Sequence, residues 1–343
     1  MKISVIIINF NGISDTRECL MSLAQAKKKG FEIETIVVDN GSTDNSVREI
    51  KKEFPETICL ENSDNLGFAE GNNVGIRYAI ERGADYLFLL NNDTTTHEHI
   101  FIELAKAATD APSGGIFCPK IYFARGYETH TERYKLTDQG KIIWYAGGVI
   151  DWKNMLAFHR GVDEIDSGQY DVMTKTVYGT GCALFVRRGV FEKTGLFDRK
   201  FYLYYEDLDF SLRARQKGFE IYYVPKALLW HKNAGSAGGT GSDLQSYYIT
   251  RNRLLIGMRY APWRTKLALL REATNLVMGG TRTQRQAVGD FLRKKYGSRE
   301  LSKLSQSRFS MPKFPTGIKM PHLPKMPDLL KYLPKIKPKR KNT

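Results

Sequence analysis

The sequence predicts an α/β fold in which helices flank a mostly parallel sheet, followed by a C-terminal helical segment and a basic, Pro-rich tail. Continuous apolar runs, typical of strands buried on both faces, recur along the first half of the chain. Stretches of helical periodicity separate these runs. This alternation implies βαβ units with right-handed crossovers, and therefore a parallel sheet.

The first two strands and helices can be placed from local signals. Residues 3–8 form a β-branched run that predicts a strand buried on both faces, and residues 33–38 predict a second one. Asp15 and Glu18 have the spacing of a capping box, so we expect them to start the helix between these strands. Ser42 is expected to cap the following helix.

The next elements alternate in the same way and then become irregular. Val74 and Tyr78 lie four residues apart on a third predicted helix, residues 86–90 predict a buried strand, and a further helix starts near residue 100. Beyond about residue 114 the expected elements are short strands and one helix. They cover residues 120–123, 142–145, 182–187 and 227–230 (strands) and 207–216 (helix).

Composition limits the class of protein. With 343 residues, of which 42% are apolar, the chain can bury a core and is not disordered overall. Its net charge of +15 suggests a polyanionic partner, namely phosphates, nucleic acid or an acidic membrane surface. Four widely spaced cysteines argue against a zinc cluster or a disulfide framework. Because no apolar run has the ~18 residues of a spanning helix, we expect a cytoplasmic protein.

Three regions follow from charge and pattern. Residues 1–253 form the predicted main domain, with halves 1–113 and 114–253. In residues 254–308, apolar positions interleave with basic ones, and two interpretations stay open: amphipathic helices on a membrane surface, or a helical subdomain docked on the core. Residues 309–343 carry nine basic side chains and one acid, a net +8, together with prolines that prevent a long helix.

Short polar side chains follow three of the predicted strands. Asn9 and Asn11 follow the first, Asp39 ends the second, and residues 91–93 follow a later one. In an open parallel sheet, ligands bind beyond these carboxyl ends. No Gly-rich phosphate loop follows the first strand, which disfavours dinucleotide dehydrogenases and P-loop enzymes. A divalent cation held by Asp93 is the other way to bind a diphosphate.

Eight segments in order resemble family-2 glycosyltransferases of the GT-A fold, particularly the bacterial rhamnosyltransferase-like branch. They are SVIIINFNG (4–12), VVDNGSTD (37–44), NLGFAEGNNVG (65–75), LLNND (89–93), GTGCALFV (179–186), YEDLDF (205–210), WH (230–231) and YYITRN (247–252). The resemblance covers roughly residues 2–253. It implies the GT-A fold and a nucleotide-sugar substrate.

The resemblance also assigns roles to particular residues of the donor site. Asp39 matches the acid that contacts the base or ribose of the nucleotide. The remaining residues implied to bind the nucleotide sugar are Asn9 and Asn11 beside that acid, Asn65, Gly67 and Asn72 under the sugar diphosphate, Asn92 in the metal motif, and Arg251 as a candidate for the diphosphate.

A metal site and a catalytic base follow from the same resemblance. Asp93 is the expected carboxylate ligand, although Asn91 stands where many relatives have Asp, and His231 matches a second ligand. This implies a weak, substrate-assisted Mg²⁺ or Mn²⁺ site. Asp207 matches the catalytic base, and because it opens a predicted helix we expect the local field to lower its pKa.

The predicted function is inverting transfer of a sugar, rhamnose or a related hexose, from a dTDP- or UDP-sugar. The acceptor is a hydroxyl of a glycan or lipid-linked saccharide in cell-surface polysaccharide synthesis. The basic tail predicts peripheral binding to the anionic inner face of the cell membrane and no nucleic-acid partner. A sugar nucleotidyltransferase and a non-catalytic basic membrane adaptor on the same scaffold are the alternatives. The sequence leaves the sugar, the linkage and the oligomeric state open.

Overall fold

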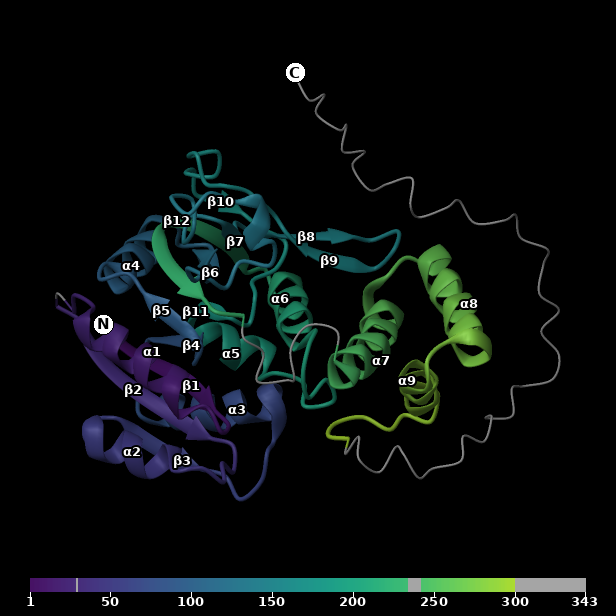
Figure 1. The fold of residues 1–343 in the computed structure, drawn as a ribbon, viewed down its shortest axis with the longest axis horizontal. Coiled ribbons are helices and arrows are strands. Elements are labelled where there is room, and N and C mark those ends of the chain that lie inside the picture. The colour runs from purple at the N-terminus through teal and green to yellow at the C-terminus, as the bar shows by residue number, and fades with distance from the viewer. Residues whose placement is uncertain (29, 234–241, 300–343) are drawn as a thin grey trace. The chain divides into compact units, whose positions relative to one another are not determined.

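A computed structural model describes residues 1–28, 30–233 and 242–299 of the protein. At the centre of the fold lies one mixed sheet covered by helices (Figure 1). The main path through the sheet runs β10-β12-β6-β11-β4-β1-β2-β3, with β5 added to β12 and β7 added to β6. The predicted α/β class with a GT-A-like sheet is confirmed.

The first half of the chain forms the parallel part of the sheet, in which β1 lies between β2 and β4. Its strands are β1 (Lys2–Asn9), β2 (Glu32–Asp39), β3 (Ile58–Glu61) and β4 (Tyr86–Asn91). The helices of this half are α1 (Ile13–Gln25), α2 (Ser46–Glu53), α3 (Gly67–Glu81) and α4 (Ile100–Asp110). Strands β1, β2 and β4 were predicted from their largely apolar runs, and β1 and β4 are buried on both faces. Strand β3 is short and only partly buried, and it was not predicted.

The second half makes the sheet mixed, because β11 (Ala183–Arg187) runs antiparallel to both β4 and β6. The other strands here are β5 (Thr94–Thr96), β6 (Gly114–Phe123), β7 (Ile143–Tyr145), β10 (Thr174–Lys175) and β12 (Glu220–His231), with a separate hairpin of β8 (Gly148–Asp151) and β9 (Leu156–His159). The helices are η1 (Thr131–Arg133), α5 (Arg188–Thr194) and α6 (Glu206–Gln216).

Two predicted helix caps are wrong. Helix α1 begins at Ile13, before Asp15 and Glu18, and these acids instead bind the Lys232 ammonium at 2.8 and 2.9 Å. Helix α2 begins at Ser46, and the Ser42 hydroxyl donates to the Asp39 carboxylate. In both places a tertiary contact uses side chains that the local pattern assigns to a helix end.

Three helices close the described chain: α7 (Asp243–Tyr260), α8 (Trp263–Gly279) and α9 (Arg282–Leu292). Their apolar faces form a second core with α6, in which Leu208 and Leu212 pack with Leu254, Leu269 and other side chains. Helix α7 crosses the expected division at residue 253, so the helical segment is built onto the main domain. Within the described residues, no helix is both long and apolar enough to cross a bilayer. The predicted tail lies outside those residues.

Candidate functional site

The polar residues expected at strand ends do converge on one edge of the sheet. Register pairs Asn9 with Asp39 at the ends of β1 and β2, and pairs Ile8 with Asn91 at the end of β4. The short strand β5 then turns back along β12 and places Thr94 opposite His231. A residue near the C-terminal end of the domain therefore meets the end of β4.

Asp93 and His231, the predicted metal ligands, are in contact. The His231 Nε2 atom lies 3.1 Å from Asp93 Oδ1, and both side chains are buried. Among the residues that the structure describes, the His231 Nδ1 atom has no hydrogen-bond partner, and the ring packs edge-on against Trp144 with 4.6 Å between ring centroids. A buried imidazole with one unpaired nitrogen is costly for a side chain that serves packing alone, which favours a functional role.

The donor set of this pair fits a hard divalent cation. One carboxylate oxygen and one imidazole nitrogen 3.1 Å apart have about the separation of neighbouring ligands that each lie ~2.1 Å from an octahedral ion. Among the residues that the structure describes, no group of three or more His, Cys, Asp or Glu side chains could hold a metal. Substrate phosphates and water would have to complete the coordination, as Mg²⁺ sites commonly require.

Asp207 lies in the first turn of α6, as predicted, but its pKa moves opposite to the expectation. Its Oδ2 accepts from the Gly181 amide at 2.8 Å and its Oδ1 from the Leu208 amide at 2.7 Å. Burial raises the pKa of Asp207 above its usual value, and the amide donors only partly offset this effect. A base with a raised pKa takes up a proton more readily near neutral pH.

A short backbone link connects Asp207 to the Asp93–His231 pair. The Gly181 amide donates to Asp207, and the next residue, Cys182, accepts at its carbonyl from the Asn91 amide at 2.9 Å. Gly181 leaves room for this approach, because a Cβ there would lie 3.5 Å from the Asp207 Cβ and 3.1 Å from the Phe68 ring. The predicted base and the predicted ligands thus border one short stretch of chain.

Asp39 lies at a depression of about 660 Å³ formed by residues 39–51 and 61–63. Its carboxylate accepts from the Asn9 amide (2.8 Å), the Ser42 hydroxyl (2.6 Å) and the Ser42 backbone amide (2.8 Å). A carboxylate has about four acceptor positions, so one remains on Oδ2 for a ligand. Asn9 is fully buried and orients Asp39, while Asn11 accepts from the Thr43 amide and holds this loop.

The start of the segment expected to lie under the sugar diphosphate is in contact with Tyr202 of the protein itself. The carbonyl of Tyr202 accepts from the amides of Phe68 and Ala69 at the start of α3. Gly67 has φ of +77°, and a Cβ there would lie 2.5 Å from the Tyr202 ring. In this structure Gly67 is therefore required by the close approach of Tyr202, and its predicted place under the sugar diphosphate stays a prediction.

The three other asparagine side chains predicted to bind the nucleotide sugar are hydrogen-bonded to neighbouring groups of the protein. Asn65 Oδ1 accepts from the Gly67 amide at 2.9 Å, and the buried Asn72 donates to the Phe68 carbonyl at 2.9 Å. Asn92 donates to the Thr16 hydroxyl at 3.1 Å, beside the end of β4. Their direct contact with a nucleotide sugar stays a prediction.

Arg251 is fully buried. Its guanidinium donates to the carbonyls of Lys200, Phe201 and Gly297 and lies 4.8 Å from the centroid of the Tyr248 ring. In this structure Arg251 therefore holds the segment that leads to Asp207. Its contact with a diphosphate stays a prediction, and these bonds would have to break for it to form.

Glu206 is a functional candidate that sequence reasoning missed. Only 4% of it is exposed, its Oε2 has no hydrogen-bond partner among the residues that the structure describes, and burial raises its pKa well above the ordinary value. The Glu-Asp pair was visible as a motif, but its burial was not visible in the sequence. The raised pKa favours the protonated carboxyl, which is a hydrogen-bond donor beside Asp207.

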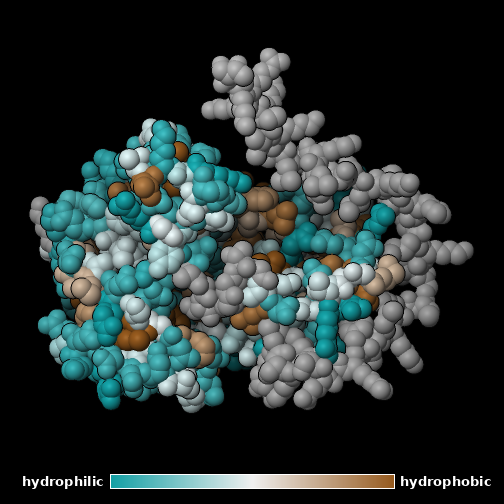
Figure 2. Space-filling model, viewed as in Figure 1, coloured by the Kyte–Doolittle hydropathy of each residue, from teal (hydrophilic) through white to brown (hydrophobic). Residues whose placement is uncertain are grey.

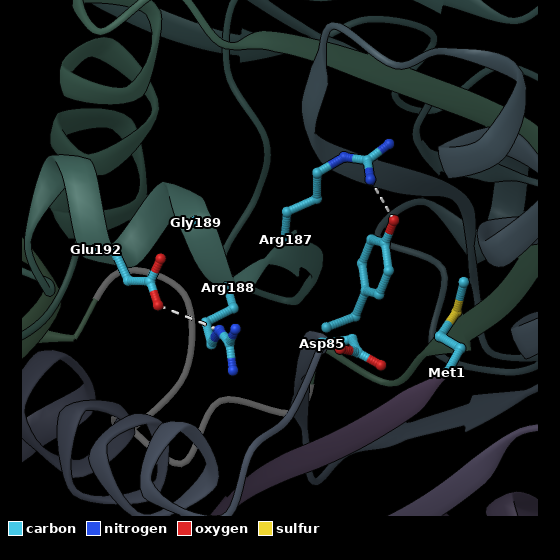
Figure 3. Close-up of a pocket in the computed structure, with 7 residues that line it drawn as sticks. Met1, Asp85, Arg187, Arg188, Gly189 and Glu192 are labelled. Atoms are coloured by element: carbon cyan, nitrogen blue, oxygen red, sulfur yellow. Dashed lines mark hydrogen bonds and ion pairs between the residues drawn. The ribbon is translucent and has the colours of Figure 1, made fainter.

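A second depression lies at the opposite edge of the sheet and is distinct from this site (Figure 3). It is lined by residues at the amino ends of β1 and β4, including Met1 and Asp85, and by the start of α5. There Arg187 donates to the Tyr86 hydroxyl, and Arg188 pairs with Glu192 at 3.1 Å. Its polar groups are engaged with one another, and none of the predicted site residues lies in it.

Sequence comparison finds relatives over most of the chain. N-acetylglucosaminyl-diphospho-decaprenol L-rhamnosyltransferase of Mycobacterium tuberculosis is 24% identical over 71% of this chain and 80% of its own length. The dTDP-rhamnosyl transferase RfbF of Shigella flexneri is 25% identical over 64% of this chain and 69% of its own. These relatives support the rhamnosyltransferase-like branch of the predicted family.

The crystal structure of GalNAc-T7 with UDP, GalNAc and Mn²⁺ has a similar fold. It superposes with a TM-score of 0.60 at 15% identity, over 86% of this chain and 56% of that one. The family model described as glycosyl transferase family 2 matches residues 4–195, which is more than half of the chain. With the convergent site at the sheet edge, these findings show that the chain belongs to glycosyl transferase family 2.

Proposed function

We propose that this glycosyltransferase moves a sugar, rhamnose or a related hexose, from a dTDP- or UDP-sugar with inversion at the anomeric carbon. The acceptor is a hydroxyl of a glycan or lipid-linked saccharide. One observation carries the proposal: Asp93 and His231 touch at 3.1 Å, and the Gly181–Cys182 link joins their edge to Asp207. A leaving-group site and a base therefore border one short stretch of chain, residues 181–182.

The nucleotide base is proposed to lie against Asp39. The free acceptor position on Asp39 Oδ2 suits an imide N–H, which thymine and uracil share. Asn9 keeps the carboxylate oriented, and Asn11 holds the 42–44 loop that forms the rim. This arrangement explains recognition of a pyrimidine and leaves the sugar to other contacts.

Asp93 and His231 would hold Mg²⁺ or Mn²⁺, and the bound cation would neutralise charge on the departing nucleoside diphosphate. Asp207 takes the proton of the acceptor hydroxyl as its oxygen bonds to the anomeric carbon. The bond from that carbon to the diphosphate oxygen breaks in the same step, so one displacement inverts the centre. The Gly181 and Leu208 amides fix the carboxylate during this transfer.

Two alternatives are weaker on the same observations. A sugar nucleotidyltransferase needs a Gly-rich, Arg-containing loop after the first strand, where residues 9–12 read Asn-Phe-Asn-Gly. A non-catalytic adaptor has no use for Asp93 and His231 buried in contact near a base. We also propose that the basic tail, which lies outside the described residues, holds the enzyme at an anionic membrane face where lipid-linked acceptors reside.

A product assay tests the proposal. The full chain is incubated with dTDP-rhamnose, dTDP-glucose, UDP-glucose or UDP-N-acetylglucosamine, Mn²⁺ and a lipid-linked saccharide, and nucleoside diphosphate release is measured. Proton NMR of the product then gives its anomeric configuration. We expect turnover with a dTDP- or UDP-sugar, and a product of inverted configuration. Retention of configuration, or pyrophosphate release, contradicts the proposed chemistry.

Asp207→Asn and Asp209→Asn form a matched pair for this assay. Asp209 is also a buried acid of α6, but its carboxylate is bound by Arg213 at 2.7 Å and Arg259 at 2.8 Å. Loss of general-base help should lower kcat of Asp207→Asn by about 10²–10⁴-fold. Asp209→Asn should lower stability, and its folded fraction should retain turnover. Equal turnover by Asp207→Asn and the parent removes Asp207 from the mechanism.

A further inference from the structure

Helix α8 has a wide apolar face, and part of it is uncovered. The inner part consists of Leu269, Ala273 and Val277, which are buried in the core that α8 shares with α7 and α9. A second set of apolar side chains is exposed: Trp263 (66%), Leu267 (58%), Leu270 (42%) and Met278 (67%). At about 100° per residue these four fall within one stripe roughly 80° wide, which adjoins the buried row beside Val277.

Basic side chains border this stripe. Arg264 and Arg271 lie along one side of it, as the helical spacing requires, whereas Lys266 lies beyond its other side, within the buried row. The acid of the helix, Glu272, is paired with Arg253 of α7, so it does not neutralise them. The Arg264 guanidinium lies 5.3 Å from the centroid of the Trp263 ring, which places a cation beside the exposed indole.

We infer that the exposed stripe of α8 binds the surface of an anionic lipid bilayer. An amphipathic helix with Trp and Leu on one face and Arg and Lys at its borders lies in the plane of a membrane interface. Trp263 suits the boundary between headgroups and acyl chains, because its indole is apolar at one end and polar at the other. Figure 2 shows apolar patches among hydrophilic residues on the side where α7, α8 and α9 lie.

Charge favours a lipid surface over a second copy of the chain. The whole chain has a net charge of +15, so two copies repel each other, whereas an anionic leaflet attracts the face. The stripe is also one helix wide, which suits shallow insertion. The inference does not depend on the sugar or on Asp207, because it rests on α8 alone.

Tryptophan quenching in the full chain tests this contact directly. The parent is mixed with vesicles of phosphatidylcholine, with or without phosphatidylglycerol, that carry bromine on the acyl chains. We expect quenching of fluorescence with the anionic vesicles. Trp263→Phe should abolish most of this quenching while vesicle co-sedimentation persists. The basic tail is present in every protein, so the differences report on α8.

Charge and apolar variants separate the two contributions. Leu267→Gln with Leu270→Gln should weaken co-sedimentation by at least about tenfold, since two exposed leucines no longer enter the bilayer. Arg264→Gln with Arg271→Gln should weaken binding to anionic vesicles by about fivefold per charge and reduce its salt dependence. The matched control is Leu136→Gln with Val172→Gln, which are each 73% exposed elsewhere. That control should bind vesicles like the parent.

The contrary results are distinct. If brominated vesicles bind the parent and leave Trp263 unquenched, or if the leucine variant binds like the parent, α8 is not the lipid contact. If sedimentation velocity shows a parent dimer that the leucine variant dissociates, the stripe is a self-interface and the inference fails. Turnover of a water-soluble acceptor should be unchanged in every variant, so this test is independent of the proposed reaction.

Discussion

At the scale of single residues, burial decides the chemistry of Asp207. The raised pKa of its carboxyl, caused by desolvation, means that it loses its proton at a higher pH than an ordinary Asp. Because a base acts only when deprotonated, kcat/KM should fall as the pH drops through this raised pKa. Initial rates are measured across an acidic pH series at varied acceptor concentration, with nucleotide sugar and metal saturating. The fall of kcat/KM toward low pH is the acidic limb of the profile. An acidic limb at or below the ordinary Asp pKa of about 3.9 contradicts the assignment.

Glu206 allows a separate test through stability. Burial raises its folded pKa well above the unfolded value, so its stabilising contribution is present at low pH and is lost as the pH rises through the folded pKa. Glu206→Gln stays neutral and escapes this loss. We expect its Tm relative to the parent to increase from about pH 4, near the ordinary Glu pKa, to about pH 8. A constant difference in Tm would show that Glu206 is already ionised.

Sequence reasoning assigned roles to residues but not their surroundings. Asp93, His231 and Asp207 were chosen because of the family resemblance, and their roles stay predictions. The pKa of Asp207 was predicted in the wrong direction, since the helix N-terminus is visible in the sequence and the burial of the carboxyl is not. The burial of Arg251 was equally invisible, because a buried arginine bound to carbonyls and a phosphate-binding arginine look identical in sequence.

At the scale of elements, α7 holds the loop before the base in a strained form. Tyr202, Tyr204 and Tyr205 all have positive φ (64°, 66° and 73°), a conformation that costs roughly 1–2 kcal/mol for each non-Gly residue. The Asn252 amide donates to the carbonyls of Phe201, Leu203 and Tyr204 at 2.8–2.9 Å. These three bonds offset the strain and fix the start of α6.

Asn252→Ala should therefore affect both folding and catalysis. Loss of the buried donor leaves the carbonyls unpaired, at a cost of about 1–3 kcal/mol in the free energy of unfolding. We expect kcat to fall while the Kd for nucleoside diphosphate is retained, because Asp39 and Asp93 lie on other elements. Urea unfolding measures the free energy of unfolding, steady-state kinetics measures kcat, and calorimetry measures the Kd for nucleoside diphosphate. Asn275→Ala, on the exposed side of α8, is the control and should change none of them.

Element prediction worked where the pattern was simple. Strands β1, β2 and β4 have largely apolar, β-branched or aromatic runs and were placed correctly. Strand β12 was predicted only at residues 227–230, although it spans Glu220–His231, because Pro225 interrupts it at a shift in register. The antiparallel direction of β11 was also not predictable, since it depends on the long excursion before it.

At the scale of the whole molecule, the described domain and the basic tail should separate experimentally. The described residues 1–28, 30–233 and 242–299 belong to one compact unit, and the assigned site residues all lie within it. Removing residues 310–343 lowers the net charge by eight, to +7. We expect unchanged Tm and unchanged turnover of a water-soluble acceptor, with weaker binding to anionic vesicles at low salt. Loss of turnover in the truncated chain would place part of the site in the tail.

The central claim is a division of roles. Asp93 and His231 hold a cation for the leaving diphosphate, and Asp207 accepts the proton of the acceptor hydroxyl. Calorimetric titration of dTDP, with and without Mn²⁺, tests this division most directly. We predict that Mn²⁺ tightens dTDP binding to the parent and to Asp207→Asn by the same factor, and that Asp93→Asn and His231→Gln lose the increase. An undiminished Mn²⁺ effect in Asp93→Asn, or its loss in Asp207→Asn, would contradict the account.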